Sequence, residues 1–257
     1  MSKQQQIAHG RHSNSSRLTF IATGQTSGRR TKYAYDYDNI GQLKAVTATE
    51  PDNSTDRLND KADFNYDASG NLTSRTANSF SQVFNSDALN QLTNIIRSGT
   101  LTVSGSFTGA VAKLGVNGTQ AQIYSDSTFA TTTGLTLSNA NNFFVTAGSN
   151  AANQLVLSTL TVSDLPETVS FVYDGNGNLR SDGQRLFEYD DADRLVAVSV
   201  TNACRIEFTY DGLSRRRVMK EYGWQWSGWV KTNETRYVCD GYVPVQERDG
   251  NGNVRVS

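Results

Sequence analysis

The sequence predicts an all-β protein in which β-hairpins form a curved sheet and one small β-sandwich is inserted between them. Gly, Ser, Thr, Asn and Tyr are abundant while long Ala/Leu/Glu/Lys stretches are missing, and this bias favours strands and turns over helices. A short strand–turn–strand unit also recurs on both sides of a segment with a different pattern. The repeated unit and its interruption together define the predicted architecture.

Size and charge narrow the classes of function. A chain of 257 residues can bury a sizeable core, and its net charge of -1 and pI of about 6.1 give no reason to expect nucleic acid or an anionic membrane as partner. The opening residues 1–30 are expected to form a polar tail and a lead-in strand. They contain no apolar signal region, and no apolar run is long enough to span a membrane.

The repeated unit is best seen at Phe171, Tyr173, Asp174, Gly177 and Leu179. It has an aromatic residue three positions before an Asp, Tyr one before, a turn-forming residue three after, and Leu five after. The other copies are Tyr35, Tyr37, Asp38, Gly41, Leu43; Phe64, Tyr66, Asp67, Gly70, Leu72; Phe84, Ser86, Asp87, Asn90, Leu92; Phe187, Tyr189, Asp190, Asp193, Leu195; Phe208, Tyr210, Asp211, Ser214, Arg216; and the half copy Tyr237, Cys239, Asp240.

Each unit is predicted to be a β-hairpin. The two aromatic residues lie two positions apart, so on a strand they point to one face. The Asp that follows can accept backbone N–H groups of a turn, and the residue three later tolerates left-handed backbone. Leu then begins the return strand. Repetition of the Asp in one turn context argues for a scaffold role and against a pair of catalytic carboxylates.

These units resemble the YD repeats of the RHS (rearrangement hotspot) family, whose signature is Tyr-Asp-x-x-Gly-Arg-Leu. The resemblance covers residues 31–98 and 168–257, although "GQL", "GNL", "NQL", "DRL" and "SRRR" stand where the family has Gly-Arg-Leu. It implies a long sheet, built hairpin after hairpin, that winds into a hollow shell and in bacterial members commonly encloses a C-terminal toxin. A chain of this length would form an arc of such a wall.

The repeats stop over residues 99–167, where short alternating apolar runs are separated by "NG", "TG", "SNANN" and "GSN". Strands are expected at Leu101–Val103, Ala112–Val116, Phe129, Leu135–Leu137 and Phe143–Val145, and strands at this spacing suggest a small β-sandwich. The segment resembles the immunoglobulin-like module found beside some glucodextranases, on Val116-Asn117-Gly118, Thr128-Phe129 and Asn141-x-Phe143. A spacer role is the simpler expectation, and glycan binding is the alternative.

Sequence signals for catalysis and for metal binding are weak. Asp174-x-Asn176-x-Asn178 and Asp249-x-Asn251-x-Asn253 imitate half of a calcium loop, but they lack its Gly at position six, so turn chemistry explains them. The only histidines, His9 and His12, lie in the polar tail, and no nucleophile elbow, phosphate loop or zinc-ligand spacing occurs. We therefore expect no enzyme activity, no catalytic residue, no metal and no cofactor.

Three further features have alternative interpretations. In "YGWQWSGWV", Trp224 and Trp226 are expected to share one strand face, Ser227-Gly228 to form the turn, and Trp229 to begin the return strand. Cross-strand packing is the simpler interpretation of the three tryptophans, and sugar stacking is the alternative. The cluster Arg215, Arg216, Arg217 and Lys220 is expected to be a solvated strand face, with an anion site as the alternative. Cys204 and Cys239 are expected to be two thiols, with one disulfide as the alternative.

The sequence thus favours a non-enzymatic segment of an RHS/YD-repeat shell in a larger secreted or cell-surface bacterial protein. Its partners would be further repeats, a core domain and a C-terminal toxin of the parent chain. The alternative function is a cell-surface adhesion module that binds carbohydrate through the insert or the tryptophans. The open β edges of a short arc lead us to expect that the chain is a fragment.

Overall fold

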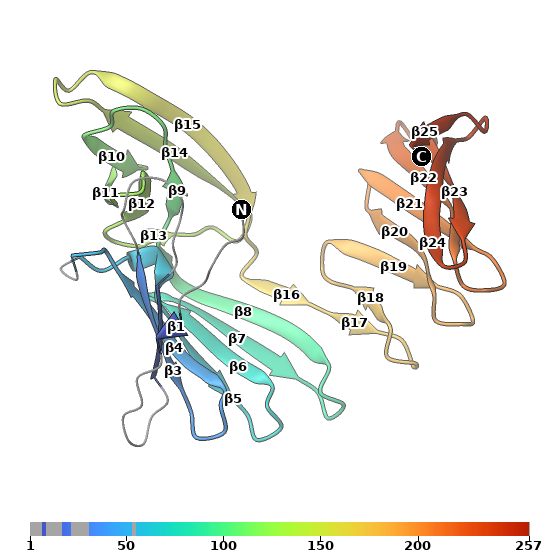
Figure 1. Cartoon of the computed structure of the whole chain (residues 1–257), viewed down its shortest axis with the longest axis horizontal. Coiled ribbons are helices and arrows are strands. Elements are labelled where there is room, and N and C mark those ends of the chain that lie inside the picture. Colours follow the sequence, from blue (N-terminus) through green and yellow to red (C-terminus); the bar gives the residue numbers. More distant parts are fainter. Residues whose placement is uncertain (1–6, 9–16, 22–30, 53–54, 257) are drawn as a thin grey trace. The chain divides into compact units, whose positions relative to one another are not determined.

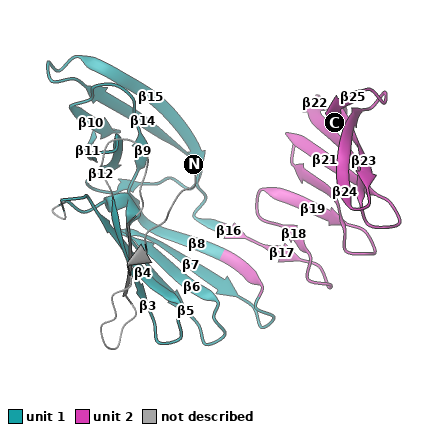
Figure 2. Ribbon diagram, viewed as in Figure 1, with its two compact units in different colours: residues 1–90, 95–168 teal, residues 91–94, 169–257 magenta. Residues whose placement is uncertain are grey.

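A computed structural model of the chain describes residues 7–8, 17–21, 31–52 and 55–256. Contacts divide the chain into two compact units (Figure 2). The first unit is Met1–Asn90 with Ile95–Thr168, and the second is Gln91–Asn94 with Val169–Ser257. The elements of the described residues are antiparallel strands, apart from one short 3₁₀ turn, η1 (Leu58–Asp60). The prediction of an all-β fold with curved antiparallel sheets is confirmed (Figure 1).

The first sheet contains the N-terminal repeats, and its strands follow one another in space in the order of the sequence. Such a meander needs only short turns between neighbouring strands. Its strands are β1 (Ile7–Ala8), β2 (Arg17–Ile21), β3 (Lys32–Tyr37), β4 (Leu43–Thr49), β5 (Ala62–Tyr66), β6 (Leu72–Ala77), β7 (Phe80–Ser86) and β8 (Leu92–Leu101), with β13 (Leu135–Thr136) and β16 (Thr168–Ser170) also paired to β8. His9 and His12 lie outside the described residues.

The inserted segment forms a sheet of its own, in the order β15-β14-β10-β11-β12-β9. Its strands are β9 (Ser104–Ser106), β10 (Lys113–Val116), β11 (Thr119–Ile123), β12 (Thr128–Thr131), β14 (Asn141–Ser149) and β15 (Leu155–Asp164). One core cluster contains Phe129 of β12 and Phe144 of β14, with Leu157 of β15 packed against it. Since strands from opposite ends of the sheet share this core, the sheet curls over it. The immunoglobulin-like type stays a prediction.

The insert leaves β8 and returns to pair with it. The backbone amide of Arg97 donates to the carbonyl of Glu167 at 2.9 Å, and that of Phe171 donates to Thr93 at 2.8 Å. Each of these pairs lies within one unit. The residues that flank the insert on the N-terminal side therefore pair with those that flank it on the C-terminal side, as the two strands of a hairpin do.

The second sheet contains the C-terminal repeats and is again a meander in sequence order. Its strands are β17 (Val172–Tyr173), β18 (Leu179–Ser181), β19 (Arg185–Tyr189), β20 (Leu195–Val200), β21 (Cys204–Tyr210), β22 (Arg216–Gln225), β23 (Gly228–Asp240), β24 (Val243–Asp249) and β25 (Val254–Val256). Few apolar side chains of this sheet are buried, among them Ala197 and Tyr237. Its stability must therefore come largely from strand pairing, turns and contacts between neighbouring strands.

Candidate functional site: the repeated aspartate turns

The Asp of the repeated unit closes the hairpin turn with its own side chain. In the hairpin of β19 and β20, Oδ1 of Asp190 accepts the backbone N–H groups of Ala192 and Arg194, both at 3.0 Å. The backbone amide of Asp190 donates to the carbonyl of Arg194, and the amide of Asp193 donates to the carbonyl of Asp190. One carboxylate thus satisfies the amides that a tight turn would otherwise leave without partners.

The same bonds recur in the other units. Oδ1 of the Asp accepts the amides two and four residues later in the turns of Asp38, Asp67, Asp174 and Asp211, and the amide two residues later in the turn of Asp87. We call these turns, together with that of Asp190, the repeat turns. Their carboxylates are engaged in local bonds, which agrees with a scaffold role.

The residue three after each Asp adopts left-handed backbone. The φ angle is 90° at Gly41, 88° at Gly70 and 91° at Gly177, and 61° at Asn90, 56° at Asp193 and 58° at Ser214. A hairpin register shift accompanies these turns, for example between Glu188 and Tyr189. A turn followed by a left-handed residue and a bulge is a common three-residue hairpin connection, and Gly, Asn, Asp and Ser are the types that tolerate it.

The residue four after each Asp has a role that sequence reasoning missed. In four of the repeat turns its side chain donates to Oδ2 of the same Asp. The distance is 2.9 Å from Asn71, 3.1 Å from Asn178, 2.8 Å from Nε of Arg194 and 2.8 Å from Nε of Arg215. We call the residues at this position (Gln42, Asn71, Gln91, Asn178, Arg194 and Arg215) the clamp residues.

Clamp residues also reach the next repeat turn. Nδ2 of Asn71 donates to Asn90 at 2.8 Å, Nδ2 of Asn178 donates to Asp193 at 2.7 Å, and Nη1 of Arg194 lies 3.4 Å from Oγ of Ser214. Each acceptor is the left-handed residue of the following turn. The clamp side chains therefore link successive hairpins at one end of their strands, where backbone pairing alone would leave the turns independent.

Two further clamp residues lie against left-handed glycines. A Cβ added at Gly70 would be 3.3 Å from Nε2 of Gln42, and one added at Gly177 would be 3.1 Å from Nε2 of Gln91. Gln91 and Gly177 lie on opposite sides of the insert in the sequence and in the same unit of the structure. The clamp contact between consecutive repeats is thus kept even where the insert separates them along the chain.

These bonds lower the pKa of the turn carboxylates. The side chain of Arg194 contributes most to the lowering for Asp190, the backbone amide of Asn178 contributes most for Asp174, and the side-chain amide of Asn71 contributes most for Asp67. Hydrogen bonds to a carboxylate favour its ionised form. All three carboxylates therefore stay ionised, as hydrogen-bond acceptors, to a lower pH than free carboxylates.

The half copy Tyr237, Cys239, Asp240 keeps only the front half of the repeated unit, and a shorter loop follows its Asp. Asp240 pairs directly with Val243, which leaves a two-residue loop of Gly241 and Tyr242. The clamp residue Arg215 still reaches this loop, donating to the carbonyl of Gly241 at 2.7 Å. A turn of the repeat type follows at Asp249, whose Oδ1 accepts the amides of Asn251 and Asn253, and this agrees with the turn chemistry expected for that run.

An asparagine closes the same turn inside the insert. Oδ1 of Asn150 accepts the amides of Ala152 and Gln154, both at 3.0 Å, and Asn153 is left-handed with φ of 59°. The turn chemistry is therefore not confined to the repeats. What distinguishes the repeat turns is the clamp side chain that reaches a neighbouring turn.

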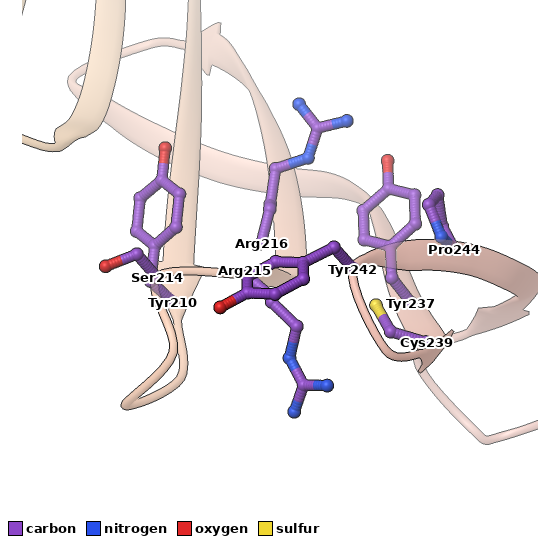
Figure 3. Close-up of a pocket in the computed structure, with 8 residues that line it drawn as sticks. All are labelled: Tyr210, Ser214, Arg215, Arg216, Tyr237, Cys239, Tyr242 and Pro244. Atoms are coloured by element: carbon purple, nitrogen blue, oxygen red, sulfur yellow. The ribbon is translucent and has the colours of Figure 1, made fainter.

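The arginine cluster is divided among structural contacts. Arg215 pairs with Asp211 at 2.8 Å, and the guanidinium of Arg216 lies 4.9 Å from the ring centre of Tyr237 and 5.6 Å from that of Phe208. Figure 3 shows the side chains of Tyr210, Arg216 and Tyr237 pointing the same way, while Arg215 points in the opposite direction. Arginine stacked on aromatic rings stabilises a thin sheet that has little buried apolar surface.

The tryptophan hairpin differs from its prediction. Gln225 pairs with Gly228, so the two loop residues are Trp226 and Ser227, and the predicted Ser227-Gly228 turn is wrong. Trp224 and Trp229 face each other across the strands with ring centres 4.9 Å apart and edge-to-face geometry. Trp226 lies at the hairpin tip, 98% exposed, with φ of 56°. The other non-Gly residues at positive φ are Asn, Ser or Asp in the described part of the chain.

A buried ionic cluster joins the insert to the N-terminal repeats. Arg57, with a side chain 5% exposed, contacts Glu50 at 2.9 Å, Asp60 at 2.8 Å and Asp126 of the insert at 3.0 Å. The hydroxyl of Tyr124, also in the insert, accepts the backbone amide of Leu58 at 2.8 Å. Hydrogen bonds and the charge of Arg57 lower the pKa of Asp126, although burial opposes them most strongly. These contacts hold the insert on the repeats within the first unit.

Cys204 and Cys239 are both free thiols. The described ranges contain no group of three or more His, Cys, Asp or Glu side chains placed to hold a metal ion. They also contain no helix that is long and apolar enough to cross a membrane.

No protein-family model and no curated protein matches the chain. Solved structures with some likeness include a TcdB2-TccC3-TEV crystal structure (11% identity, 90% of this chain, TM-score 0.29) and a TcdB2-TccC3-Cdc42 crystal structure (10%, 93%, 0.26). A third is the Photorhabdus luminescens Tc holotoxin pore (13%, 95%, 0.27). The chain spans only 14%, 16% and 14% of those chains, respectively.

Proposed function

We propose that this chain is a non-enzymatic structural segment of an RHS/YD-repeat shell, within a larger secreted or cell-surface protein that encloses or presents a C-terminal effector. The observation that carries the proposal is the side-chain contact from clamp residues to the next turn, as from Asn178 to Asp193. Because of this contact, each hairpin is stabilised mainly by the hairpins directly before and after it. Repeat proteins of this kind extend by adding units.

The hydrogen bonds that the repeat aspartates accept favour a scaffold role over a catalytic one. A catalytic carboxylate must be free to exchange a proton with a substrate at the working pH. In the repeat turns the carboxylate oxygens accept turn amides and clamp side chains, and the pKa of Asp190 is lowered by that environment. Such groups have little capacity to act as general acids near neutral pH.

The edge of the C-terminal sheet supports a longer array. β25 is the last strand of its sheet in the order β17 to β25, and among the described residues no strand pairs with its outer side in that sheet. Exposed edges are usually covered or paired. A further repeat hairpin is the element that this edge would accept in the proposed shell.

The native gene tests the proposal. We expect the coding sequence around residues 1–257 to encode further aromatic-x-Tyr-Asp units and a C-terminal effector. In the parent protein, that effector should resist a protease that cuts it readily once separated from the repeats. A parent protein without further repeats, or an effector that is cut equally fast in both contexts, contradicts the proposal.

A second candidate function is carbohydrate binding, favoured by Trp226. A bulky residue at positive φ costs about 1–2 kcal/mol, and at 98% exposure Trp226 recovers little of that cost from packing. An exposed indole flanked by Gln225 and Ser227 offers a stacking surface with hydrogen-bonding groups beside it, which suits a sugar ring. The packing of Trp224 against Trp229 makes them a support for the tip in this proposal.

A glycan array with matched variants tests this second candidate. Trp226→Gly suits the backbone conformation at that position, so it removes the indole without an expected loss of stability. Binding by the wild-type chain that disappears in Trp226→Gly supports the adhesion role. Absence of binding by the wild type, or equal binding by the variant, contradicts it.

A further inference from the structure

The outer face of the hairpin formed by β14 and β15 is apolar and exposed. Phe143 is 57% exposed, Val145 46%, Leu160 62% and Val162 48%. Phe143 pairs with Val162 and Val145 pairs with Leu160, so the four side chains form two adjacent cross-strand pairs. We call these four residues the apolar face.

The apolar face is separate from the core of the insert. Along β14 the alternate residues Phe144 and Thr146 are buried, and Phe144 belongs to the core cluster. Because successive side chains of a strand point to opposite sides, Phe143 and Val145 point away from that core. Contiguous exposed apolar side chains of this kind mark interaction surfaces.

Opposite charges lie at the two ends of the apolar face. Lys113 of β10 pairs with Ser149, and its neighbour Leu114 is buried, so Lys113 points outward near the tip of the hairpin. Asp164 pairs with Asn141 at the other end. The strand residues between these ends, 142–149 on β14 and 155–163 on β15, carry no charge.

We propose that this face binds a second copy of the chain, face to face, about a two-fold axis that sets the β14–β15 hairpins antiparallel. The apolar residues of one copy then cover those of the other, and Lys113 of each copy meets Asp164 of its partner. A parallel arrangement would place like charges together. A two-fold contact of this kind uses the same surface on both copies and closes at the dimer.

The small area of the apolar face predicts a weak association between the two copies. A face about eight residues long and three strands wide measures roughly 400 Å² per copy, from the usual strand rise and spacing. The total of roughly 800 Å² is below the standard size of a stable interface and within the range of transient complexes. We therefore expect dissociation constants in the micromolar range or weaker, with dimers formed at high protein concentration. This inference does not depend on the proposed shell function.

Sedimentation equilibrium of the full chain across the micromolar range tests the proposal with matched variants. Val162→Asp should abolish the concentration-dependent dimer. The control Leu186→Asp changes a strand residue that is also 48% exposed but lies in the second unit, and should leave the dimer intact. Far-UV circular dichroism checks that each variant is folded.

Charge exchange tests the antiparallel arrangement without altering the apolar residues. Lys113→Glu and Asp164→Lys should each weaken association about threefold, as expected for a rim ion pair. The double variant should restore it, because the two charges then meet with reversed signs. A chain that stays monomeric, a dimer unaffected by Val162→Asp, or a double variant without recovery overturns the proposal.

Discussion

The insert and the C-terminal repeats are both antiparallel sheets, yet they are stabilised in different ways. The insert buries Val116, Phe129 and Phe144 in a core shared by distant strands of its sheet. The C-terminal sheet fully buries few apolar side chains and instead places Arg194 and Arg216 against aromatic rings and neighbouring turns. One region is thus held by a common core and the other by contacts between adjacent hairpins.

The difference determines how each region responds to change. Loss of one core side chain weakens contacts to several strands of the insert at once, because they meet in the same cluster. Loss of one turn or clamp contact weakens a hairpin and its immediate neighbour. The following substitutions probe that contrast, in order of decreasing expected effect.

Substitution of the insert core should have the largest effect. Phe129→Ala removes a side chain that is 4% exposed and should lower the free energy of unfolding of the insert by about 3–5 kcal/mol. Hydrogen exchange monitored by mass spectrometry, with denaturant, measures this for the insert separately from the second unit. Val83→Ala, at a residue 41% exposed, is the control and should cost much less. Equal effects of the two substitutions would contradict a shared core.

Removal of the buried Arg57 side chain should have the next largest effect on stability. Arg57→Ala leaves Glu50 and Asp126 without their cation and should destabilise the first unit by about 3 kcal/mol. Urea denaturation measures the loss. Arg185→Ala, which removes a side chain that is 58% exposed and paired with Asp182, is the control, with an expected cost below about 1 kcal/mol. A similar cost for both would show that the Arg57 cluster does not hold the insert on the repeats.

Two Gly→Ala substitutions within one repeat turn distinguish the effect of left-handed backbone from the effect of replacing a glycine. Gly177→Ala forces a Cβ onto a residue with φ of 91° and should cost about 1–2 kcal/mol. Gly175→Ala, two residues earlier, meets no atom within 4 Å and is not at positive φ, so a change of less than about 0.5 kcal/mol is expected. Thermal unfolding of the two variants measures the difference, and reversed effects would contradict the turn geometry.

Asp190 should show the smallest and most local effect, with a characteristic pH dependence. Asp190→Asn keeps an oxygen for the turn amides, as Asn150 does, but loses the ion pair with Arg194. Asp190→Ala loses both, so the melting temperature should decrease from wild type to Asn to Ala at neutral pH. The fall should be confined to the second unit.

The pH dependence follows from the lowered pKa of Asp190. Because the folded pKa lies below the unfolded value of about 3.9, the carboxylate contributes stability above that pH and loses it as the pH falls through the folded pKa. The difference in melting temperature between wild type and Asp190→Asn should therefore become smaller below about pH 4. A difference in melting temperature that stays constant as the pH falls would show that the ionised carboxylate does not stabilise the turn.

The sequence predicted the hairpins well because their signals are local. An aromatic residue, Asp174 and Gly177 lie within a few positions, and each has a physical role that can be inferred without the rest of the fold. The clamp position could not be recognised in the sequence because it holds different residue types, such as Gln91, Asn178 and Arg194. Their common property is a side-chain N–H that reaches a turn on the next hairpin, and that requires knowledge of which hairpins are neighbours.

Other features depend on long-range contacts or on the exact position of a turn. Arg57 lies in a connection between repeats, and its contact with Asp126 joins residues far apart in the sequence. Ser227-Gly228 is a plausible turn dipeptide and predicts that Trp226 lies in a strand, whereas the register of Trp224 with Trp229 moves the turn by one residue. A shift of one residue was enough to convert an expected packed ring into an exposed one.

The central claim is that neighbouring repeat hairpins recognise each other directly and that the insert is an addition to one of them. Replacing residues 98–166 with a short Asn-Gly turn joins the paired Arg97 and Glu167 and tests it most directly. Hydrogen exchange at the amide of Phe171, which donates to Thr93, is the measurement. We predict that this amide stays protected in the shortened chain. Exchange at the rate of an unfolded peptide would contradict the claim.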